Sequence, residues 1–503
     1  MRHLSVWVLS LIAGLFLLES CQSDDGFITD SSAKLEFSVD TLRFDTVFTE
    51  LGSATRFIRV YNRNDQAIQV SKIQLEEGTN SSFRINVDGI PGNSIEDVEI
   101  PANDSIYIFT EVTVDPDAPL SESPFVITER LLFETNGNDQ QVLLEAWGQN
   151  ANYIPSRFDK GTFSLISCDF GEIVWDDPKP YVIYGILFID SCTLNIPAGT
   201  EVYVHGGLAL GENEDGSNFA YNDGGIFVLK DGQIQVDGTV DQPVVFQGDR
   251  LEEVFAEEAG QWRGINLSGS TGNAFNYAEI KNALYGVYVD SASAVTIKNT
   301  SIHHTSGPAI FARHSSVSSE NSLFYENASR AVQLTYGGNY NFKYCTMANY
   351  GFGFDSRALS LSNGTCLDPL CAQFATNGIF ARFENCILMG SSSDEVSMTD
   401  FLQGGSFFDF NVRFDHCIVR VEDMLDPVDG SFPNFFEDYA FDCINASFSD
   451  TLFADVSENI YELDTLSIAE GQAKIISSIQ KDFADRERDS TNPDIGCFEY
   501  QYE

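Results

Sequence analysis

The feature that most constrains this chain is a repeat of short strand-like segments in its second half. Each segment has four residues and closes on an apolar side chain. The segments are residues 277–280, 299–302, 320–323, 344–347, 385–388 and 416–419, and their closing residues lie 22, 21, 24, 41 and 31 positions apart. A period of roughly 20 to 30 residues built from short strands is typical of a solenoid in which each coil pairs with its neighbours. The sequence therefore predicts a parallel β-helix, with right-handed winding and with the two long spacings as loop insertions.

The first residues of the chain indicate export. A basic start precedes an apolar run from Leu4 to Leu18, which is too short for a membrane-spanning helix and fits a signal peptide. Residues 18–21, Leu-Glu-Ser-Cys, resemble a bacterial lipobox, in which Glu19 departs from the usual small or apolar residue. This resemblance implies a lipoprotein signal peptide over residues 1–20 and a lipid on Cys21.

The segment after Cys21 bears on localisation. Residues 22–26, Gln-Ser-Asp-Asp-Gly, resemble the acidic export signal of surface lipoproteins of Bacteroidota. The resemblance implies a protein held in the outer membrane by its lipid and exposed at the cell surface. Residues 21–31 are polar and contain glycine, so we expect them to be a tether.

Three cysteines recur in the repeat. They share one position of their segments with three other residues, which gives the column Ala278, Thr300, Asn321, Cys345, Cys386 and Cys417. On successive coils these side chains would lie about 4.8 Å apart. A free cysteine packs as a small apolar side chain, so we interpret the column as packing rather than as a metal or redox site.

The remaining cysteines are candidates for disulfides, because an exported chain meets an oxidising compartment. The possible pairs are Cys366 with Cys371, which flank a turn-like stretch, Cys168 with Cys192, and Cys443 with Cys497. No spacing of cysteine and histidine suggests zinc. We therefore expect no metal ligands and no cofactor.

The first half of the chain has a different texture. Short runs rich in β-branched and aromatic residues alternate with turn residues, as in the run from Thr55 to Tyr61 followed by Asn-Arg-Asn-Asp. This pattern predicts a β-sandwich over residues 32–151. Residues 44–47, 60–62 and 83–85 resemble positions of immunoglobulin-like domains of the hydin type, which implies an immunoglobulin-like fold for this segment.

The C-terminus carries a further likeness. Residues 492–500, Asn-Pro-Asp-Ile-Gly-Cys-Phe-Glu-Tyr, resemble the end of secreted bacterial β-helix proteins of the choice-of-anchor Q type, with Cys497 in place of the usual alanine. The likeness spans roughly residues 163–500 and implies a capped β-helix. We expect the parallel β-helix over residues 152–430 and the last coils with a C-terminal cap over residues 431–503, because an uncovered end would expose strand edges.

Charge and the polar residues of the repeat bear on function. With 28 Lys plus Arg against 75 Asp plus Glu, the net charge is −47, which excludes nucleic acid as a partner. Basic residues that a catalytic face would use occur on three consecutive coils: His303 and His304, then Arg313 and His314, then Arg330. Arg313 and His303 are expected to be neighbours on adjacent rungs. No paired-Asp cluster accompanies these residues, so we assign no catalytic residue.

Two functions fit this all-β organisation. The first is a non-enzymatic, lipid-anchored surface protein whose β-helix has a binding, adhesion or structural role toward an extracellular polysaccharide or another surface protein. The alternative is a carbohydrate-active enzyme, a polysaccharide lyase or a glycoside hydrolase, built on the β-helix.

Overall fold

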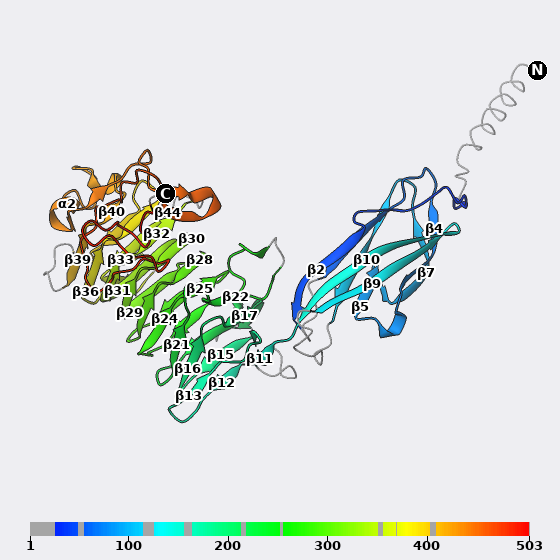
Figure 1. Cartoon of the computed structure of the whole chain (residues 1–503), viewed down its shortest axis with the longest axis horizontal. Helices are drawn as coiled ribbons and strands as arrows, with labels where there is room; N and C mark the ends of the chain where they lie inside the picture. Colours follow the sequence, from blue (N-terminus) through cyan, green and yellow to red (C-terminus); the bar gives the residue numbers. More distant parts are fainter. Residues whose placement is uncertain are drawn as a thin grey trace, which may run out of the picture. The chain divides into compact units, whose positions relative to one another are not determined.

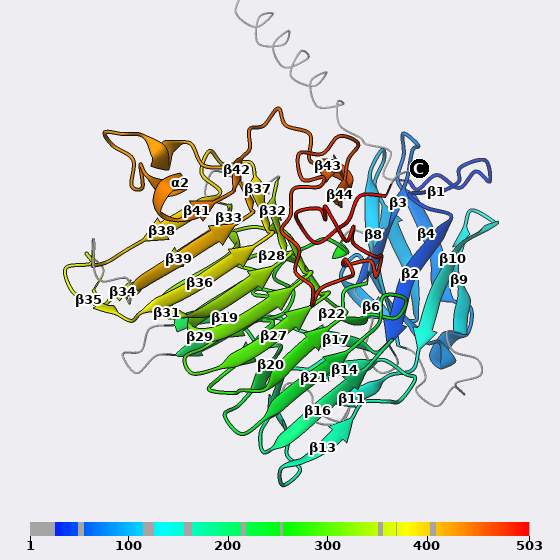
Figure 2. The same ribbon diagram turned by 60° about the vertical axis from the view of Figure 1, so that its left-hand side comes forward.

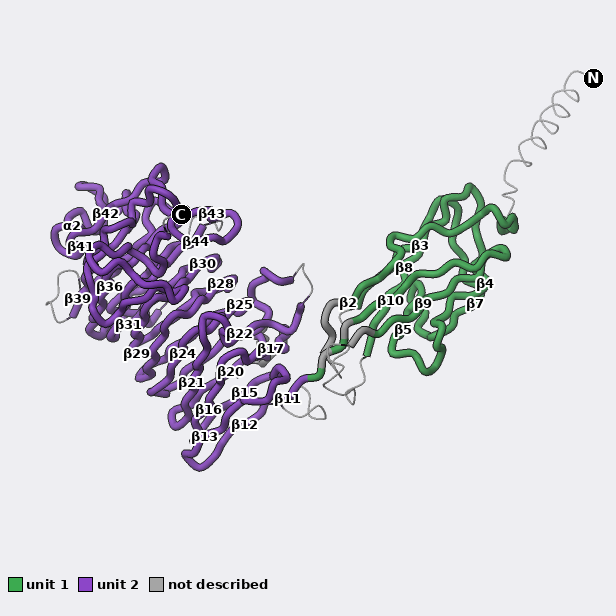
Figure 3. The backbone as a smooth tube through the Cα atoms, in the orientation of Figure 1, with its two compact units in different colours: residues 1–150 green, residues 151–503 purple. Residues whose placement is uncertain are grey.

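The chain forms two compact units, residues 1–150 and 151–503 (Figures 1 and 3). The computed structural model describes residues 26–48, 55–113, 125–154, 163–212, 218–251, 255–350, 356–368, 370–402 and 409–501. None of the helices in these ranges is long and apolar enough to cross a membrane. The predicted signal peptide and the predicted lipidation site Cys21 lie outside the described residues.

The first unit consists of two five-stranded sheets. One has the order β1 (Glu36–Phe37), β3 (Arg56–Tyr61), β8 (Ser105–Val112), β5 (Phe83–Val87) and β6 (Ile90–Gly92). The other has the order β2 (Thr41–Phe48), β10 (Asn138–Gln149), β9 (Phe125–Thr135), β4 (Ile68–Leu75) and β7 (Ser94–Ile100). Buried side chains of both sheets, such as Ile58 and Val70, form one core. The likeness of this unit to immunoglobulin-like domains stays a prediction.

The second unit is a stack of parallel strands (Figures 1 and 2). Its 11-stranded sheet has the order β11 (Asn152–Ile154), β14 (Tyr181–Tyr184), β17 (Glu201–His205), β22 (Val244–Gly248), β25 (Ala278–Lys281), β28 (Ser301–Thr305), β30 (Leu323–Asn327), β32 (Thr346–Asn349), β37 (Ile387–Gly390), β40 (Ile418–Val419) and β42 (Ile444–Asn445). Strands that are neighbours in this sheet come from successive turns of the chain, as a coil requires.

The 17-stranded sheet supplies the other faces of the coil. Its strands are β12 (Ser164–Ile166), β13 (Gly171–Val174), β15 (Ile186–Ile189), β16 (Cys192–Pro197), β20 (Gly225–Val228), β21 (Gln233–Asp237), β23 (Ile265–Leu267), β24 (Asn273–Asn276), β26 (Val287–Val289), β27 (Ala294–Lys298), β29 (Ile310–Glu320), β31 (Arg330–Lys343), β33 (Arg357–Ser362), β36 (Ile379–Glu384), β38 (Val396–Thr399), β39 (Phe410–Asp415) and β41 (Ala440–Phe441). The long strands β29 and β31 each pair with two strands of a neighbouring turn, so each contributes to two faces.

The described part of the chain also contains three pairs of short strands outside these sheets. Each is a two-stranded antiparallel ribbon: β18 (Leu208–Glu212) with β19 (Asn218–Asn222), β34 (Gly364–Cys366) with β35 (Phe374–Thr376), and β43 (Phe453–Asp455) with β44 (Ile460–Leu463). Within the described ranges, the helical elements are one α-turn, α2 (Phe435–Asp438), and the 3-10 turns Gly78–Asn80, Asp423–Leu425 and Val456–Glu458.

The repeat predicts the register of the coil, with one error. The inward column of the 11-stranded sheet is Ile280, Ile302, Phe324, Met347, Leu388 and Val419, and every member is fully buried. The expected member Leu323 is wrong by one residue, since it faces outward and packs under the C-terminal segment. The sequence offers two adjacent apolar residues here, and the apolar pattern alone does not choose between them.

A residue with positive φ begins each of these turns. Seven such residues stand where the chain passes from the 17-stranded to the 11-stranded sheet, with φ between 46° and 55°: Tyr277, Asn299, Asn321, Tyr344, Asn385, His416 and Asp442. Asn321 therefore occupies this corner and not the cysteine column, which corrects the predicted alignment. The Asn321 amide donates to the Asn299 side chain (3.3 Å), so the corner residues also bond between rungs.

The next position in each rung holds a small side chain that satisfies a backbone group. The column is Ala278, Thr300, Ser322, Cys345, Cys386, Cys417 and Cys443. The backbone N–H of Ala278 donates to Thr300 Oγ1 (3.3 Å), and that of Cys417 donates to Cys443 Sγ (3.3 Å). Because a buried N–H needs an acceptor, a hydroxyl or thiol fits this column.

Two of the three possible disulfides are present, Cys168–Cys192 and Cys366–Cys371. The pair of Cys443 with Cys497 is wrong, because both are free thiols. Cys443 continues the small-residue column, whereas the Cys497 backbone N–H bonds to Thr346 Oγ1 (3.1 Å). Cys443 and Cys497 therefore pack at two separate places, the small-residue column and the C-terminal segment.

The interior of the last coils is an aromatic stack. The rings of Phe342, Phe383 and Phe414 are nearly parallel, with centroids 5.3 Å and 4.8 Å apart. Phe435 of α2 lies 5.4 Å beyond Phe414 and is fully buried. Residues 421–441 therefore cover the end of the coil interior.

The C-terminal segment, residues 464–501, has a different position from the predicted cap. It runs along the side of the coil (Figure 2), where Ile495 and Cys497 pack on the outward side chains of Ile387 and Ile418. We call this segment the C-terminal strap. Its hydrogen bonds reach the corner residues directly: the Asn321 amide donates to the Lys481 carbonyl (2.8 Å) and the Asn385 amide to the Lys474 carbonyl (2.7 Å).

The acidic residues of the terminal motif hold the strap together. The Asp494 carboxylate accepts from the backbone N–H groups of Gly471 and Tyr500, both at 2.7 Å. The Glu499 carboxylate accepts from Asp489 N–H (2.7 Å) and from the buried Arg488, which also donates to Asn321 Oδ1 (3.0 Å). These carboxylates are therefore structural.

Gly496 of this motif offers a test of the strap. Its φ is +101°, and a Cβ at this position would lie 2.5 Å from Ile387 Cδ1. We expect Gly496→Ala to lower the free energy of unfolding by about 1–3 kcal/mol, from backbone strain and overpacking together. Urea titration measures this. The control Gly207→Ala, whose Cβ would make an ordinary 3.6 Å contact, should stay near wild type; equal losses in both variants would contradict the packing described.

Candidate functional site

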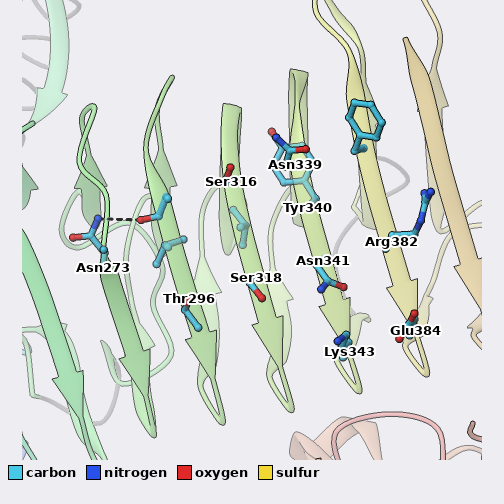
Figure 4. A pocket seen from close by; sticks show the side chains of 15 residues that line it. Asn273, Thr296, Ser316, Ser318, Asn339, Tyr340, Asn341, Lys343, Arg382 and Glu384 are labelled. Atoms are coloured by element: carbon cyan, nitrogen blue, oxygen red, sulfur yellow. Dashed lines mark hydrogen bonds between the residues drawn. The ribbon is translucent and has the colours of Figure 1, made fainter. Parts of the chain in front are cut away.

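An open groove crosses one outward face of the coil. It extends over β24, β27, β29, β31 and β36 and encloses about 670 Å³. Figure 4 shows its side chains on successive strands. The groove therefore uses the same outward positions on four consecutive rungs, β27 to β36, and reaches Gly272 and Asn273 on the rung before them.

Two register columns form the floor of the groove. One is Thr296, Ser318, Asn341 and Arg382; the other is Ala294, Ser316, Asn339 and Phe380. Their side chains are small on the first rungs and longer on the last two. Phe380 is 39% exposed and presents an aromatic surface beside the amides. The floor thus combines hydroxyls, amides, a guanidinium and one ring.

Charged side chains border one edge. Lys298, Glu320, Lys343 and Glu384 follow one another in register, with alternating sign. Lys298 and Glu320 form an ion pair at 2.8 Å. Arg382 is held in place because it donates to the Asn411 carbonyl (3.1 Å) and to the Asn411 side chain. Among the described residues that line the groove, Glu384 is the one carboxylate, since Glu320 lies at the edge and pairs with Lys298. Most glycoside hydrolases use two carboxylates.

Tyr340 and Asn273 are structural members of the lining. Tyr340 is buried and donates to the Gly337 carbonyl (2.8 Å); burial raises its pKa to about 12. Asn273 donates to the Ala294 carbonyl (3.1 Å) and accepts from Ile234 N–H (3.1 Å). Both side chains fix the backbone beneath the groove, so the polar floor rests on a rigid support.

A second cluster lies on the 11-stranded sheet, where the two predicted histidines sit. His303 Nε2 is 3.2 Å from Glu279 Oε1, and His303 Nδ1 is 2.6 Å from His304 Nδ1. Lys281 Nζ is 3.0 Å from the same Glu279 oxygen. The Tyr325 ring stacks on His303 with centroids 4.5 Å apart. Carboxylate, imidazole and imidazole thus form one hydrogen-bonded chain.

Burial and pairing set the charge of this chain. Burial alone would raise the pKa of Glu279, but the His303 hydrogen bond and the nearby Lys281 hold it at about 2. Burial lowers the pKa of His303, and it lowers that of His304 to about 4. Glu279 is therefore ionised and accepts Nε2–H of His303. His303 Nδ1 then accepts Nδ1–H of His304, which leaves His304 Nε2 as an unprotonated base.

Glu326 lies one rung from His304 and shares its conformation. The residues that follow them, Thr305 and Asn327, are register partners, and both His304 and Glu326 have a φ of 49°. A left-handed glutamate within a strand is uncommon and is worth a functional explanation. Burial raises the pKa of Glu326 to about 7, with the Tyr461 hydroxyl 3.5 Å from Oε1.

The structure separates the other predicted residues. Arg313 is on β29 of the 17-stranded sheet, beside Asp290 (3.9 Å) and over the Tyr336 ring (5.3 Å), whereas His303 is on β28 of the 11-stranded sheet. The expected rung neighbourhood of Arg313 and His303 is therefore wrong. His303 is in register with Lys281 and Tyr325 instead. The connection after β28 turns a corner before β29 begins, which moves Arg313 to another face.

Sequence reasoning missed several residues of these sites. Glu279 and Tyr325 stand in the same register columns as Ser301 and His303, so a strict alignment of the repeat from the corner asparagines would have placed them together. Phe380 and Arg382 follow the long insertion between β32 and β36, which hides their register.

One group of residues has the composition of a metal site. Ligand atoms of Asp415, His416 and Asp442 lie within 4.8 Å of one another. Asp415 already accepts from His416 (2.7 Å) and faces Arg413 (3.3 Å) and Lys474 (3.4 Å). A cation would have to displace these positive partners, so the donor set fits a divalent ion poorly.

Comparisons with known proteins agree with this architecture. A family model described as right handed beta helix region matches residues 258–400, and one described as pectate-lyase like beta helix domain matches residues 167–309. The chain thus contains right-handed β-helix domains. No curated protein matches the chain in sequence.

Several solved structures show low similarity. The catalytic domain of a GH87 alpha-1,3-glucanase in complex with nigerose is 12% identical, with 73% of this chain and 82% of that chain covered and a TM-score of 0.21. A family 28 exopolygalacturonase of Yersinia enterocolitica is 9% identical, with 84% and 89% covered and a TM-score of 0.23. A protein of unknown function from Porphyromonas gingivalis is 14% identical over 23% of this chain, which spans 46% of that protein, with a TM-score of 0.18.

The charge state of Glu326 gives a prediction. Its pKa is raised from 4.5 to about 7, so the folded protein holds this proton more tightly than the unfolded chain does. The stabilisation is complete below pH 4.5 and is lost as the pH rises through 7. We therefore expect the melting temperature of wild type, relative to Glu326→Gln, to fall between pH 5 and pH 8.

Thermal unfolding followed by circular dichroism across this range measures the difference. The exposed neighbour Glu462 on β44 supplies the matched control, since Glu462→Gln should follow the wild-type curve at every pH. Parallel curves for wild type and Glu326→Gln would contradict the raised pKa.

Proposed function

We propose that this protein binds an extracellular polysaccharide along the groove of its β-helix without cleaving it. The observation that carries the proposal is the groove itself, which repeats polar side chains in register over four rungs, from Thr296 to Arg382. A polymer repeats its hydroxyl groups along its length, and the rungs repeat their donors and acceptors about every 4.8 Å. Many weak contacts along one polymer then add to a useful affinity.

The chemistry of the floor suits sugars. Hydroxyl, amide and guanidinium groups donate and accept hydrogen bonds, and the exposed Phe380 ring offers an apolar surface for a sugar face. The groove is open at the surface, as a long polymer requires. The −47 charge of the whole chain does not extend to this floor, where Arg382 and Lys343 accompany Glu384.

Substitution in the groove tests the proposal. We expect Asn341→Ala combined with Arg382→Ala to weaken polysaccharide binding by about tenfold or more, since it removes a side chain from each of two adjacent rungs. The measurement is calorimetric titration with a panel of neutral and uronic-acid polysaccharides.

The control is Gln333→Ala, a change on the same strand β31 but on a different face of the coil. Its affinity should equal that of wild type. Circular dichroism establishes that each variant is folded. An unchanged affinity in the double variant, or an equal loss in the control, would exclude the groove as the binding site.

We further propose that the protein is a lipoprotein of the outer membrane, exposed at the cell surface and anchored through Cys21. Support comes from the apolar run that ends at Leu18, the lipobox-like residues and the acidic residues after Cys21. In this proposal, the immunoglobulin-like unit spaces the β-helix from the membrane. Another surface protein is a second possible partner of the exposed coil.

The anchor has a direct test. Mass spectrometry of the N-terminal peptide from the membrane fraction should find an acylated Cys21 as the first residue. Replacement of Cys21 by Ala should release the protein from the membrane fraction. A mature N-terminus at another position would refute the proposed anchor.

The second candidate function is a carbohydrate-active enzyme, and one observation favours it. Glu279, His303 and His304 form a chain that ends in an unprotonated base, and Glu326 nearby holds its proton up to about pH 7. Incubation of the protein with polyuronates and neutral glycans, with and without Ca²⁺, separates the two functions. Reproducible shortening of a polymer that is lost in Glu326→Gln would establish the enzyme and overturn our proposal of binding alone.

A further inference from the structure

Three arginines gather at the corner that leads from the 11-stranded sheet into β31, β33 and β38. Arg330 and Arg357 begin β31 and β33 and are register partners, so their side chains leave adjacent rungs on the same side. Glu395 lies on the next rung, where its carbonyl accepts from Leu359 N–H (2.9 Å). Arg420 follows on the rung after that, and its carbonyl accepts from Glu395 N–H (2.8 Å).

The guanidinium groups at this corner have unused donors. Within the described part of the chain, Arg330 Nε, Arg357 Nε and Arg420 Nη1 are buried and have no hydrogen-bond partner. Arg420 is only 6% exposed, with its guanidinium over the Phe448 ring at 2.9 Å from the centroid. Buried donors of a charged group are costly when they are left unpaired, and each one calls for an explanation.

The positive charges at the corner are also poorly balanced. Arg330 and Arg357 are like charges directly opposite each other on paired strands, an arrangement that destabilises a sheet. Glu395 is fully buried between Arg357 and Arg420, but its oxygens accept from the backbone N–H groups of Ala358 (2.8 Å) and Ser392 (2.6 Å). Two guanidinium groups, those of Arg357 and Arg420, therefore act on one carboxyl.

The neighbouring carboxylate of Asp394 is hydrogen-bonded to backbone groups and not to the guanidinium groups in the described structure. The Asp394 carboxylate accepts from the backbone N–H groups of Glu422 (2.7 Å) and Met424 (3.1 Å). Burial raises the pKa of Tyr350, which faces Glu395 and Arg420, so this phenol stays neutral. Among the described residues of the corner, three guanidinium groups thus stand against two carboxyl groups, those of Asp394 and Glu395, in a chain whose net charge is −47.

We infer that the corner formed by Arg330, Arg357 and Arg420 is a binding site for an oxyanion. A sulfate, phosphate or carboxylate group accepts hydrogen bonds from planar guanidinium groups. It would satisfy the unpaired nitrogens and separate the two like charges. The group comes either from a dissolved ion or from a charged substituent of an acidic polymer.

This site is distinct from the groove. Arg330 is the first residue of β31, whereas Asn341 and Lys343 of the groove are at the other end of that strand. Oxyanion binding at the corner therefore does not depend on the proposed polysaccharide site, and the two sites can be tested separately. Arg330 and Arg357 keep part of their surface exposed, which gives an anion access.

The experiment is a titration of the purified chain with sodium sulfate at constant ionic strength, with sodium chloride as the balancing salt. We expect a saturable rise in melting temperature with sulfate, because a ligand that binds the folded state stabilises it. In Arg330→Gln combined with Arg357→Gln, the apparent affinity should fall by about tenfold or more. Arg313→Gln, which alters an arginine on another face, should respond as wild type does.

Further measurements distinguish a specific site from general salt effects and identify the source of the anion. Sulfate stabilises many proteins without a site, so an equal, unsaturable rise in all variants would overturn the inference, as would no rise in wild type. Arg357→Lys keeps the positive charge but removes the planar guanidinium group, so we expect an affinity between those of wild type and the double variant. This variant tests the inference even where the double variant is unstable. Dextran sulfate compared with neutral dextran separates the sources: tighter binding than inorganic sulfate indicates a polymer, and equal binding per sulfate a dissolved ion.

Discussion

Seven successive turns of this coil, from Tyr277 to Asp442, depend on one residue in the left-handed conformation between the two sheets. L-residues adopt this conformation at a cost, and asparagine does so at a lower cost than most because its amide bonds locally. Asn299, Asn321 and Asn385 fill the corner on three rungs, and their amides bond to the next rung or to the C-terminal strap. The small side chain that follows accepts a backbone N–H of the rung before it. The corner therefore fixes the register, and the outward columns inherit their alignment from it.

The repeat was predictable from sequence because it is local. Apolar and small residues recur within each short segment, so the parallel coil and most of its inward column could be read directly. The error at Leu323 arose because the apolar pattern permits two registers there; the asparagines at 299 and 321 set the correct one. The sequence predicted that the C-terminal residues would cover the end of the coil, and this position was wrong for a different reason. Ile495 packs on Ile387 across a long sequence separation, and no periodic pattern in the sequence predicts such a contact.

The sites were less predictable than the fold. The floor of the groove consists of Ser, Thr and Asn, which are common on any solvated strand, and only their alignment over several rungs makes a site. His303 and His304 were recognisable as candidates, but their partner was sought on the wrong sheet, because the corner after β28 was not visible in the sequence. Of the three corner arginines, the sequence analysis named Arg330 alone. Arg357 and Arg420 belong to turns with insertions of different length, which hide their alignment with Arg330.

The C-terminal strap changes how the coil can unfold. In a solenoid each turn contacts only its neighbours, so turns can open one after another from either end. The strap bonds to corner residues on several turns, from Tyr277 (3.4 Å to Asp485) through Asn321 to Asn385, and so joins turns that do not touch one another. These turns must open together or release the strap first. The C-terminal strap thus makes the unfolding of these turns cooperative beyond nearest neighbours.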